Sequence, residues 1–398
     1  MTGYLMSNTQ LTSNYLNEID KSINQKSVFY DLFKKNGFPT SKNENWKYTP
    51  FSLFPDSPSF GKLKSSVSKT SDNINNQFHH LVIENNIISD RQDLSDEFEL
   101  SNNKNLCADD FDLISDSLNS LTQTIASQKI NLVINKTLKK PLLIELNYDC
   151  ELNAENWCSN VFNIKLNKNV HASIIIKENG RIATSSTIFN FELSEYSILN
   201  HLNIVQNRNR NLSSSFFTLQ EDSYLNSFTK VSSTVFSKQI LEVNLKGKNA
   251  IADLNGLFET ENENFSDILT LIKHNSAHTN SNQLFKGIAR DKSRSVYNGK
   301  VFISKDCSKC NTTQLSRNLI KDKSARIYSR PQLEVYNDDV TCSHGSTFGQ
   351  LSDSELFYLI SRGIDKNQAE KLLQSAYYNE AIELIKDPEI KLFAKRFL

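Results

Sequence analysis

The sequence predicts a mainly β protein whose core is a parallel β-solenoid flanked by helical regions. Short apolar, β-branched or aromatic runs recur from about residue 112 to residue 336. Many of them alternate with a period of two, as in the run 241–245, which is the periodicity of a strand. Hairpin dipeptides are clearest at Asn179-Gly180 and Asn298-Gly299, and no convincing helix separates the runs. Many strands with so few hairpin turns and no crossover helices indicate strands that stack on their equivalents one coil later.

The size of such a solenoid can be estimated from its repeat. At roughly 20–24 residues per coil, the β-rich stretch would make on the order of ten coils. An antiparallel sandwich is the competing architecture, because it also uses many short strands. Adhesins and polysaccharide lyases share the solenoid, so the architecture does not by itself indicate a function.

Length and composition exclude several classes of protein. The 398 residues are enough for two or three domains, and 45 basic residues balance 45 acidic ones, which argues against a bulk basic field that holds nucleic acid. No apolar run approaches the ~18 residues of a membrane span, and the first residues lack the pattern of a secretory signal. Six cysteines are too few for a disulfide scaffold. A reduced cytoplasmic protein is the simplest interpretation.

Three regions are expected along the chain: an N-terminal helical region with a small hairpin and a flexible linker at 1–110, the solenoid at 111–340, and a C-terminal helical domain at 341–398. In the first region, apolar residues at helical spacing predict helix over 8–36, and Gly37 ends it. Residues 55–77 are mostly Ser, Asn, Lys and Asp, which is typical of a surface linker.

Two further local patterns are expected at the ends of the solenoid. Asn85-Asn86 between two apolar runs predicts a tight hairpin, because Asn tolerates a positive φ. At the other end, Ser352 and Glu355 form a capping box that opens a first helix. Asp365 opens a second helix, and Asp387-Pro388 opens a third with proline where no amide is needed. Such helices either seal the end of a solenoid or form a docking module.

Motifs for nucleotide binding and hydrolysis are missing. The sequence has neither a phosphate loop nor a Gly-x-Ser-x-Gly elbow, so any ATP must be bound by another chain. His274 and His278 are four residues apart, but they lie among predicted strands, where that spacing is too long for close chelation. We therefore interpret them as ordinary polar residues of the solenoid.

Cysteine and histidine give two sites that could bind metal. Cys307-Ser-Lys-Cys310 has the spacing of a ligand pair, and Cys342-Ser-His344 places a thiol and an imidazole on one side of an extended segment. Together they could form a zinc site, although the first pair lacks the usual glycines, and small apolar side chains in a corner are the simpler interpretation. Cys342 and His344 are expected in an exposed loop between the last strand and the first capped helix, where a Cys/His pair can bind soft or borderline metals.

In several motifs the chain resembles the SufB/SufD family, the scaffold subunits of the SUF machinery for iron–sulfur cluster assembly. The segment 338–364, with its Cys-Ser-His-Gly and Phe-Tyr-Leu…Arg-Gly combination, is similar to the C-terminal signature of the family. Glu44-Asn-Trp-Lys-Tyr-Thr49 is similar to the N-terminal motif, and 285–288, 315–319 and 330–335 also fit. Gly345 follows His344, where SufB proteins typically carry Glu, so the chain is most similar to the SufD branch.

The resemblance implies a function and a set of partners. It implies a right-handed parallel β-helix and a non-catalytic scaffold that pairs with a SufB-like subunit through the end of that helix. A transient Fe–S cluster would form at this interface, with His344 and Cys342 as the candidate ligands of this chain. An imidazole binds metal at neutral pH without losing a proton, whereas a thiol must first be deprotonated, so His344 is the stronger candidate. Without that partner the chain could form a homodimer.

The C-terminal helices are the region that the resemblance assigns to a SufC-like ATPase. A flavin could also belong to the complex, but no residue of this chain indicates a site for it. Two other functions remain as alternatives on the residues alone: a stand-alone zinc-binding solenoid and a β-helix enzyme acting on polysaccharides. The candidate ATPase-docking residues are Leu356, Phe357, Leu359, Arg362, Leu372 and Leu373.

Overall fold

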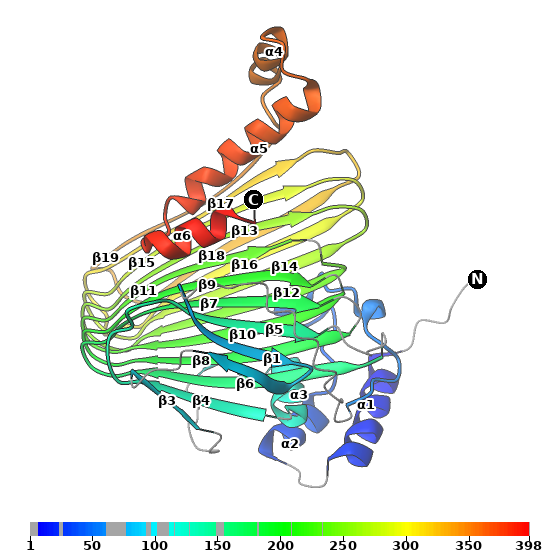
Figure 1. Ribbon diagram of the computed structural model, residues 1–398, viewed down its shortest axis with the longest axis vertical. Helices are drawn as coiled ribbons and strands as arrows, with labels where there is room; N and C mark the ends of the chain where they lie inside the picture. Colours follow the sequence, from blue (N-terminus) through cyan, green and yellow to red (C-terminus); the bar gives the residue numbers. More distant parts are fainter. Residues whose placement is uncertain are drawn as a thin grey trace.

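The computed structural model shows a two-sided parallel β-solenoid with helices against both of its outer faces (Figure 1). The structure describes residues 7–23, 27–60, 77–92, 97–101, 111–114, 116–126, 128–148, 155–180, 183–207, 209–232 and 234–397. The expected linker at 55–77 lies mostly outside these residues. None of the described helices is long and apolar enough to cross a membrane.

Consecutive strands of the solenoid alternate between two sheets, so that each coil contributes one strand to each. The neighbouring solenoid strands pair in parallel, which confirms the predicted parallel solenoid and excludes the sandwich. The first sheet contains, in spatial order, β19 (Val340–Gly349), β17 (Cys310–Ile320), β15 (Asn280–Ala289), β13 (Ile251–Thr260), β11 (Tyr224–Val231), β9 (Ile198–Asn207), β7 (His171–Gly180), β5 (Leu142–Tyr148), β1 (His79–Glu84) and β2 (Ile87–Gln92). The second contains β18 (Arg326–Val335), β16 (Arg294–Ile303), β14 (Phe265–His274), β12 (Phe236–Leu245), β10 (Arg210–Leu219), β8 (Thr184–Leu193), β6 (Trp157–Leu166), β4 (Gln128–Ile134) and β3 (Phe98–Ser101).

The expected coil length and number were wrong. The solenoid has about seven turns, and the register places Thr184, Arg210, Phe236 and Phe265 at one position of successive coils. One coil therefore takes 26 or more residues, because it carries two ten-residue strands and two corners. The coil lengthens further toward the C-terminus, where Arg294 is paired with Arg326.

The corners explain why hairpin dipeptides are scarce. Between β6 and β17, each corner at which the chain passes from the second sheet to the first has one residue with a positive φ: Asn169, Tyr196, Asp222, Asn249, His278 and Lys309. This left-handed residue lets the chain change direction at the corner without requiring Asn-Gly. Both Asn-Gly pairs that were expected as hairpin turns lie instead within strands, at the end of β7 and in the middle of β16.

The first coil is closed by antiparallel strands. β2 pairs antiparallel with β1 through Asn85 and Asn86, which have φ values of 49° and 71°, so the predicted hairpin is confirmed. β3 pairs antiparallel with β4, a strand that the sequence did not reveal. Both sheets thus end on this side with a strand that runs against the direction of the solenoid.

Helices at the N-terminus cover the outer face of the second sheet. They are α1 (Asn8–Ser22), α2 (Val28–Asn36) and α3 (Ser117–Ile125), with short 3-10 helices η1 (Glu44–Trp46) and η2 (Phe51–Leu53). Gly37, at φ 63°, ends α2 as predicted. The helix α3 was not predicted, although Leu118, Leu121 and Ile125 have helical spacing and Asp116 caps it. Its apolar face packs on β6 and β8.

The N-terminal family motif, residues 44–49, attaches the N-terminal helices to the second sheet. The indole of Trp46 donates a hydrogen bond of 2.6 Å to Asp116, and the Lys238 ammonium lies 4.8 Å from the ring centre. Lys238 also forms a buried ion pair of 2.7 Å with Asp267 and donates to the Asn45 carbonyl. A buried charge requires such partners, so these residues fix the N-terminal segment against β12 and β14.

Three helices follow the last strand: α4 (Asp353–Ser361), α5 (Lys366–Ile382) and α6 (Pro388–Lys395). Their predicted caps are confirmed, because the side chains of Ser352, Asp365 and Asp387 accept hydrogen bonds from the first-turn amides. The C-terminal half of α5 and all of α6 pack through apolar residues on the outer face of the first sheet. The helix α4 and the first half of α5 extend away from the solenoid (Figure 1), and we call this projecting part the arm.

Candidate functional site

The two candidate metal ligands lie on β19, the last strand of the first sheet. A loop was expected here, and that expectation was wrong, because β19 pairs with β17 over ten residues. The register sets Thr312 opposite Cys342 and Gln314 opposite His344. In β17 the lumen-facing residues, which alternate along the strand, are buried. Alternation and register therefore place Cys342 and His344 together on the lumen side, at the end of the solenoid.

Cys342 and His344 differ in their surroundings. The thiol of Cys342 is half-buried against an apolar cluster that contains Cys307 and Cys310. Burial, with a smaller contribution from Cys310, raises the pKa of the Cys342 thiol. His344 is exposed. The imidazole is thus accessible to a metal, whereas the thiol needs a metal or a nearby positive charge before it can act as a thiolate.

The cysteine pair Cys307 and Cys310 has a structural environment. Both side chains are buried, and the Cys310 Sγ lies 3.2 Å from the Thr279 hydroxyl. Within the described ranges, no group of three or more Cys, His, Asp or Glu residues is arranged to hold a metal ion. The spacing of Cys307, Cys310, Cys342 and His344 in the sequence is therefore not matched by an arrangement that could bind zinc. The two buried thiols fit the interpretation of Cys307 and Cys310 as small apolar side chains in a corner.

His274 and His278 also have structural positions. The His274 ring is buried, with its two nitrogens 2.8 Å from the Thr279 hydroxyl and 2.9 Å from the Ser281 hydroxyl. Burial lowers the pKa of His274 to about 4, so the ring is neutral at physiological pH. His278 occupies a left-handed corner. The interpretation of both as polar solenoid residues agrees with these positions.

The end of the solenoid around Cys342 and His344 is open. Among the described strands, β18 and β19 are the outermost members of their sheets, so each has one edge of unpaired backbone groups. Tyr336 is 57% exposed and Phe348 is 51% exposed at this end. We call the surface formed by β18, Tyr336 and β19 the open end. Unpaired strands bearing large apolar side chains are the features of a surface that another chain covers.

The lumen below the open end holds buried polar atoms without partners. Gln314 is fully buried, and Asn318, Ser329 and Ser346 each carry a buried oxygen with no hydrogen-bond partner. Buried side-chain atoms without a partner also occur deeper in the described lumen, as on Asn160 and Ser213, so this feature does not by itself distinguish the open end. The sequence could not reveal this set, since it depends on the register between β17, β18 and β19.

The candidate docking residues lie on the arm. Phe357 on α4 is 73% exposed and Leu372 on α5 is 52% exposed. Arg362 is exposed and lies 5.3 Å from the ring of Tyr358. The remaining three candidates, Leu356, Leu359 and Leu373, are half-buried. The arm thus presents large apolar side chains to solvent rather than packing them against the solenoid.

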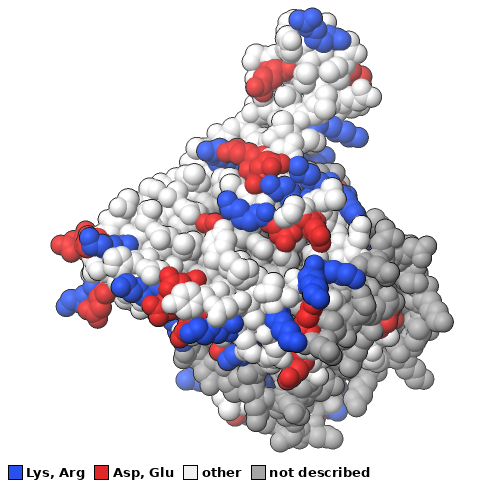
Figure 2. Space-filling model, turned by 60° about the vertical axis from the view of Figure 1, so that its left-hand side comes forward, with Lys and Arg blue, Asp and Glu red and all other residues white. Residues whose placement is uncertain are grey.

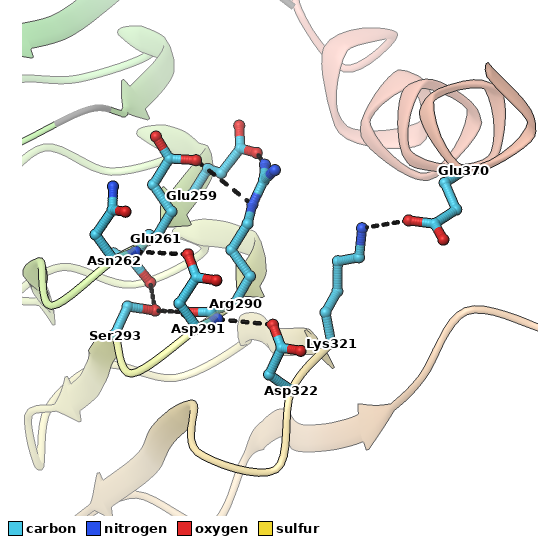
Figure 3. A network of polar contacts seen from close by, with 10 residues as sticks. Glu259, Glu261, Asn262, Arg290, Asp291, Ser293, Lys321, Asp322 and Glu370 are labelled. Atoms are coloured by element: carbon cyan, nitrogen blue, oxygen red, sulfur yellow. Dashed lines mark hydrogen bonds and ion pairs between the residues drawn. The ribbon is translucent and has the colours of Figure 1, made fainter. Parts of the chain in front are cut away.

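Ion pairs attach the arm to the last coils. Lys321, at the corner after β17, forms a 2.8 Å ion pair with Glu370 on α5 (Figure 3). Glu380 binds both Lys286, at 2.6 Å, and Arg317. Figure 2 shows acidic and basic side chains mixed where the arm meets the solenoid. The arm is therefore tied to the corner after β17 through Glu370, and the second half of α5 is tied to β15 and β17 through Glu380.

The corners beside this attachment are themselves linked by a carboxylate ladder. The Asp291 carboxylate accepts the Asn262 amide at 2.8 Å, and the Asp322 carboxylate accepts the Asp291 amide at 2.7 Å (Figure 3). Arg290 pairs with Glu259 from the preceding coil. These contacts stack one corner on the next and hold the corner from which Lys321 reaches the arm.

Comparisons with known proteins place this geometry in a family. Residues 152–377 match the family model described as "SUF system FeS cluster assembly, SufBD core domain". The chain is 26% identical over 377 residues to "Iron-sulfur cluster assembly protein SufD" of Escherichia coli (strain K12), a match that covers 90% of this chain and 88% of that protein. Two further relatives match over shorter regions. The Bacillus subtilis (strain 168) protein of the same name is 28% identical over 130 residues, covering 33% of this chain and 30% of that protein. "Protein ABCI7, chloroplastic" of Arabidopsis thaliana is 27% identical over 146 residues, covering 36% of this chain and 31% of that protein.

Proposed function

The chain belongs to the SufBD family of the SUF system for iron–sulfur cluster assembly, and from this premise we propose that it is a non-catalytic scaffold subunit of the SufD type, acting in the cytoplasm. It pairs with a SufB-like subunit, docks a SufC-like ATPase and contributes ligands to a nascent cluster. The observation that carries this proposal is the position of His344, exposed on the last strand of an open solenoid end.

The open end is the proposed surface for the SufB-like partner. The partner covers the exposed apolar side chains of Tyr336 and Phe348 and the free edges of β18 and β19. In the absence of that partner, a second copy of this chain could occupy the same surface, since two identical solenoid ends can meet about a two-fold axis.

The cluster is cargo shared between the two subunits. His344 supplies an imidazole nitrogen and Cys342 supplies a thiolate, while the partner completes the coordination sphere. Iron binds both nitrogen and sulfur donors. The raised pKa of the Cys342 thiol makes His344 the more important ligand, because the thiol reacts only after a metal has displaced its proton.

The arm is the proposed docking site of the ATPase. Phe357 and Leu372 expose large apolar side chains there, and the ion pair between Lys321 and Glu370 connects the arm to a corner of the last coils. Movement of the docked ATPase would thus act on the coil that neighbours β19. ATP-driven rearrangement could then open and close the shared cluster site.

The experiment that tests the ligand assignment is complementation of a strain that depends on this pathway. His344→Ala should leave the complex with SufB-like and SufC-like subunits intact but abolish growth. Cys342→Ala should give an equal or milder defect. His171→Ala is the matched control, because His171 is also exposed on a strand of the same sheet. Full growth with His344→Ala would refute the assignment.

The docking proposal needs a narrower test than removal of all three helices. Deleting 352–398 would uncover the outer face of the first sheet, because residues such as Tyr378, Ile382 and Phe393 are buried against it. Phe357→Ala with Leu372→Ala should instead abolish co-purification of the ATPase from a folded chain. Leu392→Ala, on α6 and 62% exposed, is the matched control. Unchanged ATPase binding by the double variant would contradict the docking proposal.

A further inference from the structure

The N-terminal family motif reaches from its place on β12 to the last strand of the second sheet. Trp46 is buried, with its ring beside the ammonium of Lys238 in β12. The residues two positions before and after it, Glu44 and Tyr48, contact β18 instead. Glu44 is 286 residues away in the sequence from its partner in that strand. The motif therefore joins the N-terminal region to the outermost strand of the open end.

Two contacts of different kinds connect the motif with β18. The Glu44 carboxylate accepts a hydrogen bond of 3.0 Å from the Gln332 amide and one of 2.7 Å from the Arg330 guanidinium. These two donors, Gln332 first, hold the pKa of Glu44 below its usual range. The Tyr48 ring stacks on the Tyr328 ring, with centres 4.5 Å apart and planes inclined by 12°. Because residues 328, 330 and 332 alternate along the strand, all three project from its outer face.

β18 has a neighbouring strand on one side only. Among the described strands it pairs with β16 alone. The Tyr336 amide donates to the Ile303 carbonyl of β16, so by alternation the even-numbered amides of β18 also face β16 and the odd-numbered ones face the free edge. Pro331 occupies one of these free-edge positions, where its missing amide removes no bond. One row of backbone bonds thus holds β18 from within the sheet, and the motif holds it from outside.

The motif does not pack continuously on the sheet between its two places of contact. A pocket of about 240 Å³ is lined by Glu44 and Asn45 of the motif and, among others, by Leu269 in β14 and by Asn298 and Lys300 in β16. The contact with β18 therefore depends on the side chains of Glu44 and Tyr48. Changing them should release β18 while the buried indole between them stays in place.

We propose that the N-terminal family motif is a clamp on β18, which fixes the outermost strand of the open end in the position that a partner requires. A surface that is already ordered loses less conformational entropy when it binds. The N-terminal region thus takes part in organising the open end. Its importance for the SufB-like partner rests on the function proposed above, whereas the clamp itself does not.

Hydrogen exchange in the purified full-length chain tests the clamp. Glu44→Ala with Tyr48→Ala should speed the exchange of backbone amides at 326–335 at least threefold, because β18 then keeps only its bonds to β16. Residues 236–245 in β12 should exchange at the native rate, since Trp46 remains buried there. An unchanged rate at 326–335 would overturn the proposal. An equal increase at 236–245 would also overturn it, because the motif would then support the sheet as a whole.

Two further variants show whether the contact itself is responsible. Glu18→Ala removes an ion pair within α1 and is the control, which should leave exchange at 326–335 unchanged. Arg330→Ala breaks the ion pair with Glu44 from its other side, so combining it with Glu44→Ala should give less than the product of the two single effects. Fully multiplicative effects, or the same increase with Glu18→Ala, would contradict the clamp.

Calorimetric titration with the SufB-like partner tests the role of the clamp in binding. The chain with Glu44→Ala and Tyr48→Ala should bind at least twofold more weakly, because only molecules with β18 in place can bind. Unchanged affinity together with faster exchange at 326–335 would overturn this role. Phe348→Ala, in β19, separates that result from a failure of the proposed function. If Phe348→Ala also leaves the affinity unchanged, the partner does not bind the open end, and it is the proposed function that fails.

Discussion

The two ends of the solenoid are finished in different ways. At the first coil, the antiparallel strands β2 and β3 cover the edges of β1 and β4. At the last coil, β18 and β19 are the outermost strands and still run in the direction of the solenoid, and Tyr336 and Phe348 expose large apolar side chains beside them. A solenoid stacks identical interfaces, so an end without a cap is an incomplete interface. The difference supports the proposal that the partner binds at the last coil.

The largest change in the free energy of unfolding is expected from a cavity in the lumen near the first coil, where β2 and β3 pair antiparallel; we call this the closed end. The Phe162 ring is buried and stacks on Phe189, with ring centres 4.9 Å apart. Phe162→Ala should lower the free energy of unfolding by about 3–5 kcal/mol, because it leaves a cavity in a packed core. Urea denaturation of the purified chain measures this change. A loss below about 1 kcal/mol would mean that the closed half is not the rigid part of the molecule.

A second prediction concerns the pH dependence of the same half of the lumen. Burial raises the pKa of Glu178 to about 7, above the ordinary value near 4.5 that it has when unfolded. Stability from the protonated form is therefore fully present below pH 4.5 and is lost as the pH rises toward 7. Glu178→Gln should remove this loss and stabilise the chain at pH 8 by roughly 2–3 kcal/mol. Unfolding curves at pH 5 and pH 8 should show a gain only at the higher pH; a gain of equal size at both would contradict the raised pKa.

The matched substitution at the open end should act on binding instead. Phe348 is a phenylalanine on the lumen side of β19 but is 51% exposed. Phe348→Ala should change the free energy of unfolding by less than about 0.5 kcal/mol. It should weaken association with the SufB-like partner by about tenfold or more, as expected of a large apolar side chain at an interface centre. Calorimetric titration with that partner measures the affinity, and unchanged binding would contradict the role of the open end.

The smallest effect is expected at the base of the arm. Lys321 and Glu370 are both partly exposed, at 20% and 25% of their side chains. Ion pairs of this kind contribute about 0–1 kcal/mol. Glu370→Gln should therefore alter thermal stability little, and less at high salt than at low salt. A change above about 2 kcal/mol would show that the arm contributes to the fold itself.

The sequence predicted those features that depend on local chemistry. The caps at Ser352, Asp365 and Asp387 were identified because a side chain and a nearby amide specify them. The parallel solenoid followed from strand periodicity combined with the scarcity of hairpin turns. The left-handed corners were missed, because residues such as Tyr196 and Lys309 are not the usual residues at a positive φ.

Features that depend on register could not be predicted. The segment 340–349 contains Ser, Gly and Thr and resembles a loop, but its pairing with β17 makes it a strand. Asn298-Gly299 has the sequence of a hairpin turn, but Gly299 lies within a strand. Its missing side chain leaves space for the Gln314 side chain, which comes from the opposite sheet. His344 was identified from the family resemblance, while its place above Gln314 emerged only from the paired strands. The candidate ligand was thus predictable, and its surroundings were not.

Hydrogen exchange with and without the SufB-like partner tests the central claim most directly. The partner should slow exchange of backbone amides in β18 and β19, because their free edges become covered, and should leave β2 and β3 unchanged. Protection confined to residues 326–349 is the predicted result. Protection at 87–101, or none on β19, would show that the open end is not the surface where the partner binds.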